Sequence, residues 1–102
     1  MKKISRLETL LGEYEQFTSK LCKLPSWERL CRTLDGFFAL YPERREPEEF
    51  FPTDAQDYAQ FRRSKGLVDK SIATELRLIG GFFTWLRDVK QLPVLLITKG
   101  VA

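Results

Sequence analysis

Basic and hydroxyl side chains in the last third of the chain recur at the spacing of a helix. Lys70, Thr74 and Arg77 are followed by Gly81 and Thr84. At about 100° per residue, all five positions fall on one side of such a helix. Guanidinium, ammonium and hydroxyl groups donate hydrogen bonds to phosphate and carboxylate oxygens. These positions therefore predict a face that binds an anionic partner.

A second stretch, earlier in the chain, repeats this arrangement independently. Arg29, Arg32 and Gly36 lie opposite an apolar stripe, with Ser26 and Thr33 alongside. A basic face opposite an apolar stripe is often only the solvated side of a helix. Two such faces in one short chain favour a polyanionic partner, and the solvated face is the alternative.

The remaining charges are distributed unevenly. Arg62, Arg63 and Lys65 form a basic group just before the Lys70 face, whereas the carboxylates concentrate between Glu43 and Asp57. Lys and Arg number 17 against 14 acidic residues, which gives a formal net charge of +3. This small excess permits a polyanionic partner without requiring one, so the positions of the charges matter more than their sum.

Two adjacent glycines, Gly80 and Gly81, interrupt the apolar helical pattern RLIGGFFTWLR. Each glycine costs about 1 kcal/mol relative to alanine in a helix interior, so the pair indicates the close approach of another group. That group is either a neighbouring helix or a partner bound to the Lys70 face. The sequence leaves both alternatives open.

Residue content removes many kinds of catalytic chemistry for this chain acting alone. The chain has no histidine, which rules out imidazole catalysis and histidine-ligated zinc. Cys22 and Cys31 both stand in segments with helical spacing, so we expect free, partly buried thiols and no metal site. Glu46, Glu48 and Glu49 stand in a proline-bearing loop without fixed geometry. We therefore expect no catalytic residue, no metal and no cofactor.

Apolar periodicity predicts an all-α domain of four to five helices. Pro25 begins the second helix, Thr53 and Gln56 have the spacing of a capping box at the third, and Gly66 ends the third. A length of 102 residues fits one such domain. The four main helices are predicted over residues 7–21, 25–41, 53–66 and 69–89.

The fourth helix has the widest apolar arc, which includes Ile79, Phe82 and Trp85. Such an arc indicates a central helix that contacts several neighbours, and a partner surface is the alternative. Asp69 or Ser71 is predicted to cap this helix.

The start of the chain, Met1 to Arg6, is basic, but no apolar run long enough for a signal peptide or a membrane span follows it. We therefore expect a cytoplasmic protein without a membrane partner.

Four motifs follow one another in a characteristic order in the second half of the chain. They are DAQDYAQFR from Asp54 to Arg62, then KGL from Lys65, then Ser71-Ile72, and then a helical run from Leu76 that ends in FFTWL at Leu86. In order and spacing they resemble the N-terminal core-binding domain of tyrosine recombinases and phage integrases. The similarity covers about residues 7–93. It departs at Val68, where the family often has a capping serine, and at Gly80 or Gly81, where it often has arginine.

The resemblance implies a SAM-like orthogonal bundle that binds double-stranded DNA through its second and fourth helices during DNA recombination and integration. Residues 1–93 would form this non-catalytic domain, and residues 94–102 would begin a linker to a catalytic domain of the same full-length protein. The isolated domain is expected to be a monomer, and a helical module for self-association is the alternative function. With the basic group at residues 62–65, the predicted DNA-binding residues are Ser26, Arg29, Arg32, Arg62, Arg63, Lys65, Lys70, Ser71, Thr74 and Arg77.

Overall fold

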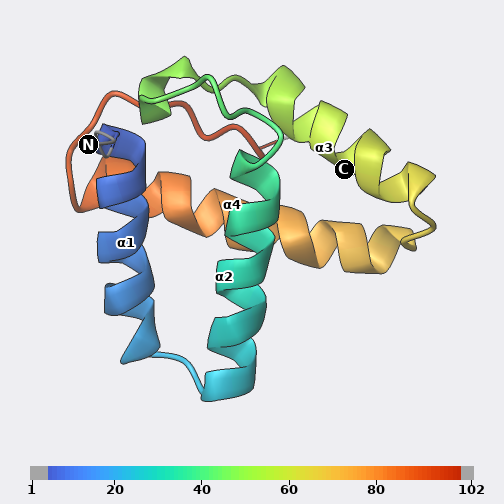
Figure 1. Ribbon diagram of the computed structural model, residues 1–102, viewed down its shortest axis with the longest axis horizontal. Coiled ribbons are helices and arrows are strands. Elements are labelled where there is room, and N and C mark those ends of the chain that lie inside the picture. The colour runs from blue at the N-terminus through green and yellow to red at the C-terminus, as the bar shows by residue number, and fades with distance from the viewer. Residues whose placement is uncertain (1–4, 100–102) are drawn as a thin grey trace.

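A computed structural model describes residues 5–99, and the regular secondary structure of this part is entirely helical. Four α-helices and one short 3-10 helix occur in it (Figure 1). The prediction of an all-α domain with four to five helices is therefore confirmed for these residues. The elements are α1 (Arg6–Ser19), α2 (Leu24–Phe38), η1 (Pro47–Glu49), α3 (Pro52–Ser64) and α4 (Asp69–Asp88).

Helices α1 and α2 run alongside one another and are joined by a short turn (Figure 1). Helix α1 begins after Ser5, whose Oγ accepts a hydrogen bond from the Glu8 N–H at 3.1 Å. Pro25 lies in the first turn of α2 as predicted, where a missing N–H breaks no helical hydrogen bond. The Trp27 indole N–H donates to the Glu15 carbonyl at 2.7 Å and joins the two helices.

Helix α3 begins one residue earlier than predicted. It starts at Pro52, and the Asp54 carboxylate accepts a hydrogen bond from the Phe51 N–H at 2.8 Å. The capping box predicted to start at Thr53 is therefore wrong, because Thr53 already lies inside the helix. Gly66 follows the helix with φ of 91°, the left-handed conformation expected at this end.

Helix α4 is the longest element and crosses α1 and α2 on one side of the pair (Figure 1). It packs against α1, α2 and α3, which confirms its predicted central position. The helix begins at Asp69 after Val68, and no side chain caps its first turn. The predicted cap from Asp69 or Ser71 is therefore wrong.

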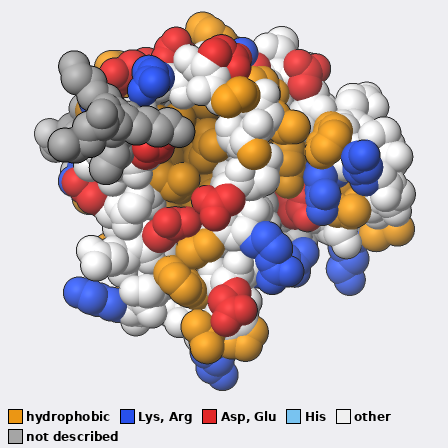
Figure 2. All heavy atoms as spheres, viewed as in Figure 1, with side chains coloured by type: hydrophobic (Ala, Val, Ile, Leu, Met, Phe, Trp, Pro, Cys, Tyr) orange, Lys and Arg blue, Asp and Glu red, His pale blue; other side chains and the backbone are white. Residues whose placement is uncertain are grey.

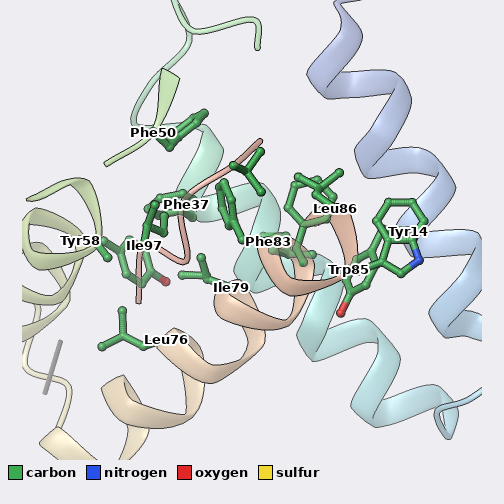
Figure 3. Packing of buried hydrophobic residues seen from close by; sticks show 14 of the residues in the cluster. Tyr14, Phe37, Phe50, Tyr58, Leu76, Ile79, Phe83, Trp85, Leu86 and Ile97 are labelled. Atoms are coloured by element: carbon green, nitrogen blue, oxygen red, sulfur yellow. The ribbon is translucent and has the colours of Figure 1, made fainter. Parts of the chain in front are cut away.

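The wide apolar arc of α4 forms the centre of the hydrophobic core. Ile79, Phe82, Phe83 and Leu86 on this arc are fully buried. Figure 3 shows side chains from α1, α2 and α3 gathered around Ile79, Phe83 and Leu86. Because these four side chains are covered within the domain, this part of the arc belongs to the core.

Segments without regular structure also contribute to the core. Phe50, in the loop before α3, is buried, and its ring lies 5.9 Å from that of Phe83. In the C-terminal segment, Val94 and Ile97 are buried, and Figure 3 shows Ile97 among the core side chains. Residues 94–97, expected to begin a linker, therefore pack onto the helical domain.

Candidate nucleic-acid interface

A cleft of about 540 Å³ opens between α2, α3 and α4, and we call it the first cleft. Figure 2 shows Lys and Arg side chains gathered beside α2 and toward α3. Three of the predicted DNA-binding residues come together here from two helices. The lining residues are Pro25, Arg29, Arg32, Thr33, Gly36, Tyr58, Phe61, Arg62 and Glu75.

Arg29 and Arg32 form the open, charged wall of the first cleft. Both side chains are exposed on α2, and neither has a carboxylate within ion-pairing distance among residues 5–99. One turn further on, Gly36 leaves open space where a side chain would stand. Their charges are therefore available to a ligand. Ser26, also predicted to contact DNA, is exposed in the first turn of the same helix.

Arg62 differs from these two arginines, because a buried carboxylate holds it. Its Nε and Nη2 donate to the two carboxylate oxygens of Glu75 at 3.0 and 3.1 Å. The Tyr58 hydroxyl donates to the same carboxylate at 2.7 Å. Burial and this hydrogen bond raise the pKa of Tyr58. Arg62 thus lines the cleft in a fixed position with its charge largely balanced.

Glu75 was not among the predicted site residues, although the sequence contains a signal for it. Ile72, Glu75 and Ile79 share one helical face, since they are three and four residues apart. All three are buried. A glutamate between two isoleucines on a core-facing stripe requires a cationic or hydrogen-bonding partner inside the protein.

The other two residues of the basic group at the end of α3 are also partly engaged. Arg63 Nε lies 3.1 Å from Asp69 Oδ1, and the carboxylate is well exposed. The Lys65 ammonium lies 5.4 Å from the centre of the Phe61 ring. Arg63 and Lys65 remain at the surface, but Asp69 offsets part of the charge that the sequence assigns to this group.

The predicted residues on α4 lie on another side of the domain. Glu75 lines the first cleft, and Arg77 is two positions further along, which is about 200° around the helix. Lys70 is exposed, whereas Ser71 and Thr74 are half-buried. The Arg77 face and the α2 arginines therefore do not line a common cleft, although the sequence pattern predicts that both bind the same anionic partner.

Arg77 instead lines a second cleft of about 420 Å³, between α4 and the C-terminal segment. The glycine pair forms part of its floor. A Cβ on Gly80 would overlap Thr98 Oγ1, and a Cβ on Gly81 would lie 3.0 Å from the Tyr14 hydroxyl. Both glycines thus accommodate parts of the same domain, which favours the packing alternative for the pair.

Thiol chemistry lacks support in the described residues. Cys22 and Cys31 are free and half-buried, as predicted. Burial, followed by the nearby Glu15 carboxylate, raises the pKa of the Cys31 thiol to about 12, so this thiol stays protonated at neutral pH.

Between residues 5 and 99, no group of three or more His, Cys, Asp or Glu residues is arranged to hold a metal ion. Over the same range, no helix has both the length and the apolar character needed to cross a membrane.

No family model, no curated protein and no solved structure matches this chain. The resemblance to the core-binding domain of tyrosine recombinases therefore stands on the motifs between Asp54 and Leu86 alone.

Proposed function

We propose that this chain is a DNA-binding module of a site-specific recombinase or integrase, as its motifs imply. The observation that carries the proposal is the pair Arg29 and Arg32, two exposed guanidinium groups without carboxylate partners among residues 5–99. Guanidinium groups bind phosphate oxygens through paired N–H donors. In this role the chain is non-catalytic and acts with a catalytic domain of the same full-length protein.

The shape of the first cleft suits a DNA backbone. The open space at Gly36 lets a sugar-phosphate strand approach α2 just beyond the two arginines. Arg62 stands on the opposite wall, where Glu75 fixes its orientation. Contacts of this kind position a protein on a duplex without reading its sequence.

The proposal predicts weak binding by the isolated domain. Non-specific protein–DNA complexes typically have dissociation constants of about 10⁻⁴ to 10⁻⁶ M at physiological salt. A domain that provides only part of the contacts between a recombinase and DNA is expected to have a dissociation constant in this range. Nanomolar binding of a random duplex would contradict the idea that a second domain supplies part of the DNA contacts.

The test is a titration of a fluorescently labelled random duplex at several salt concentrations. We compare the wild-type domain with the double variant Arg29→Gln/Arg32→Gln. Each lost phosphate contact flattens the dependence of log K on log salt by about 0.9. The double variant should therefore bind more weakly and with a visibly smaller salt dependence.

The matched control is the double variant Arg45→Gln/Arg87→Gln, which removes the same charge from exposed positions outside the first cleft. This control should bind almost as the wild type does. Equal losses in the two double variants would show that only net charge matters, and an absence of binding at low salt would reject the DNA proposal.

Self-association remains the alternative function, and a different surface favours it. Phe17, Leu21 and Leu24 are exposed around the turn between α1 and α2. Sedimentation of the same samples decides between the two functions. A dimer that dissociates in a Leu21→Gln/Leu24→Gln variant, together with no DNA binding, would support self-association.

A further inference from the structure

The C-terminal segment is held against α4 by packing. Val94 and Ile97 are buried, and the Lys99 N–H donates to the Leu96 carbonyl at 3.1 Å to close a turn. The turn brings Thr98 against Gly80. Thr98 and Lys99 therefore have defined positions beside α4, although they belong to no regular element.

This packing creates the second cleft and determines which polar groups line it. Arg77 and Thr84 reach it from α4, and Thr98 and Lys99 reach it from the turn. Among residues 5–99, no Asp or Glu lines this cleft. Within the described part of the chain, Arg77 and Lys99 have no ion-pair partner. The cleft thus brings together two unbalanced positive charges from segments that are distant in the sequence.

The hydroxyl groups add hydrogen-bonding capacity to these charges. Neither Thr84 nor Thr98 makes a side-chain hydrogen bond within residues 5–99, whereas Thr74 on the same helix donates to the Lys70 carbonyl at 3.1 Å. Leu96 and the glycine backbone supply an apolar floor between the polar groups. Two cations, two free hydroxyls and an apolar floor match a phosphate group attached to a sugar.

We infer that the second cleft is a phosphate-binding site, with Arg77 and Lys99 as its charged ligands and Thr84 and Thr98 as hydroxyl donors. The phosphate is either a phosphodiester of DNA or a free phosphate. Arg77 and Thr84 belong to the face that the sequence pattern assigns to an anionic partner, whereas Thr98 and Lys99 lie outside it. The site lies across α4 from the first cleft, so it is a second and separate contact. The inference that the site binds a phosphodiester of DNA rests on the proposed function, whereas the inference that it binds free phosphate does not.

The first arm of the test uses inorganic phosphate alone. The ¹⁵N-labelled domain is titrated with phosphate at constant ionic strength, and the amide shifts of Gly80, Gly81, Thr84 and Thr98 are followed. We expect shifts that saturate. The single variants Arg77→Gln and Lys99→Gln should each weaken the apparent affinity about tenfold, as expected for the loss of one charge-assisted hydrogen bond. Shifts that do not saturate, or that persist unchanged in both variants, would overturn the inference.

The control for this arm is Lys20→Gln, an exposed lysine at the end of α1 that lines neither cleft. It should bind phosphate as the wild type does. Melting curves of all variants verify that each is folded before its affinity is compared.

The second arm repeats the titration with a short DNA duplex at low salt, using the wild type and the Arg29→Gln/Arg32→Gln variant. Shifts of the second-cleft amides that persist in this variant would support an independent phosphate contact with DNA. If DNA shifts only first-cleft amides and phosphate shifts neither cleft, the inference fails and the proposed function stands. If phosphate shifts the second cleft and DNA shifts neither, the proposed function fails and the inference stands.

Discussion

The two clefts on either side of α4 hold their basic residues by different means. In the first, the Arg62 guanidinium is fixed by hydrogen bonds to the buried carboxylate of Glu75, which Tyr58 also contacts. In the second, Lys99 is positioned because the segment before it packs onto Gly80 and into the core.

This difference has an electrostatic consequence. A buried counter-ion orients a cation but cancels much of its charge, and the pair must also offset its own desolvation. Apolar packing orients a segment and leaves the charges on it unbalanced. Around the first cleft, the loss of a polar group should therefore cost the most stability. Around the second cleft, a change in side-chain volume should cost the most.

The largest effect is expected from the aromatic cluster that joins α1 and α4. The Trp85 ring lies 5.2 Å from that of Tyr14 and 6.3 Å from that of Phe82. Trp85→Ala should lower the free energy of unfolding by about 3 to 5 kcal/mol, because it opens a large cavity. Urea denaturation measures this loss.

Trp85→Phe is the matched control. The indole N–H of Trp85 is buried without a hydrogen-bond partner in the described residues, so the change to phenylalanine costs volume but no hydrogen bond. It should retain most of the stability. Equal losses in both variants would show that the indole has a polar partner after all.

A smaller effect is expected when the ion pair of the first cleft is broken. Arg62→Ala leaves Glu75 buried with only Tyr58 as a partner. The loss should be about 2 kcal/mol, between the values typical of exposed and of buried pairs. Arg63→Ala, which breaks the exposed pair with Asp69, should cost about 0.5 kcal/mol or less. Similar small losses in both variants would mean that water screens the Glu75 pair effectively.

An effect smaller than that of Arg62→Ala is expected when one glycine from each cleft is replaced. Gly81→Leu gains helix propensity of about 1 kcal/mol but crowds the Tyr14 hydroxyl, and overpacking costs about 1 to 3 kcal/mol. We expect a net loss of about 1 kcal/mol, seen as a lower melting temperature. Gly36→Leu meets open space and should raise the melting temperature. A stabilised Gly81→Leu variant would remove the packing explanation for the glycine pair.

The helices were predictable because their signals are local. Apolar spacing, Pro25 at the start of α2 and Gly66 after α3 each act within one or two turns of the chain. The cap of α3 was missed because the helix starts at Pro52, which places both Thr53 and Asp54 inside the first turn, and Asp54 then accepts a hydrogen bond from the Phe51 N–H.

The candidate site was predictable only in part, because ion pairing depends on residues from other helices. The pattern on α2 identified Arg29 and Arg32, whose charges stay unpaired within residues 5–99. It could not separate them from Arg62, since the carboxylate that holds Arg62 is 13 residues away on α4. The packing of Val94 and Ile97 was missed because a segment this short has no measurable periodicity.

The contact between Thr98 and Gly80 constrains how this sequence can change over generations. Any side chain at position 80 would require another rotamer or a smaller residue at position 98, or a different path for the C-terminal segment. Descendants of this sequence are therefore expected to change the two positions in a correlated way, or to retain both. The same contact shapes the second cleft, so paired changes at positions 80 and 98 should also move the Lys99 side chain.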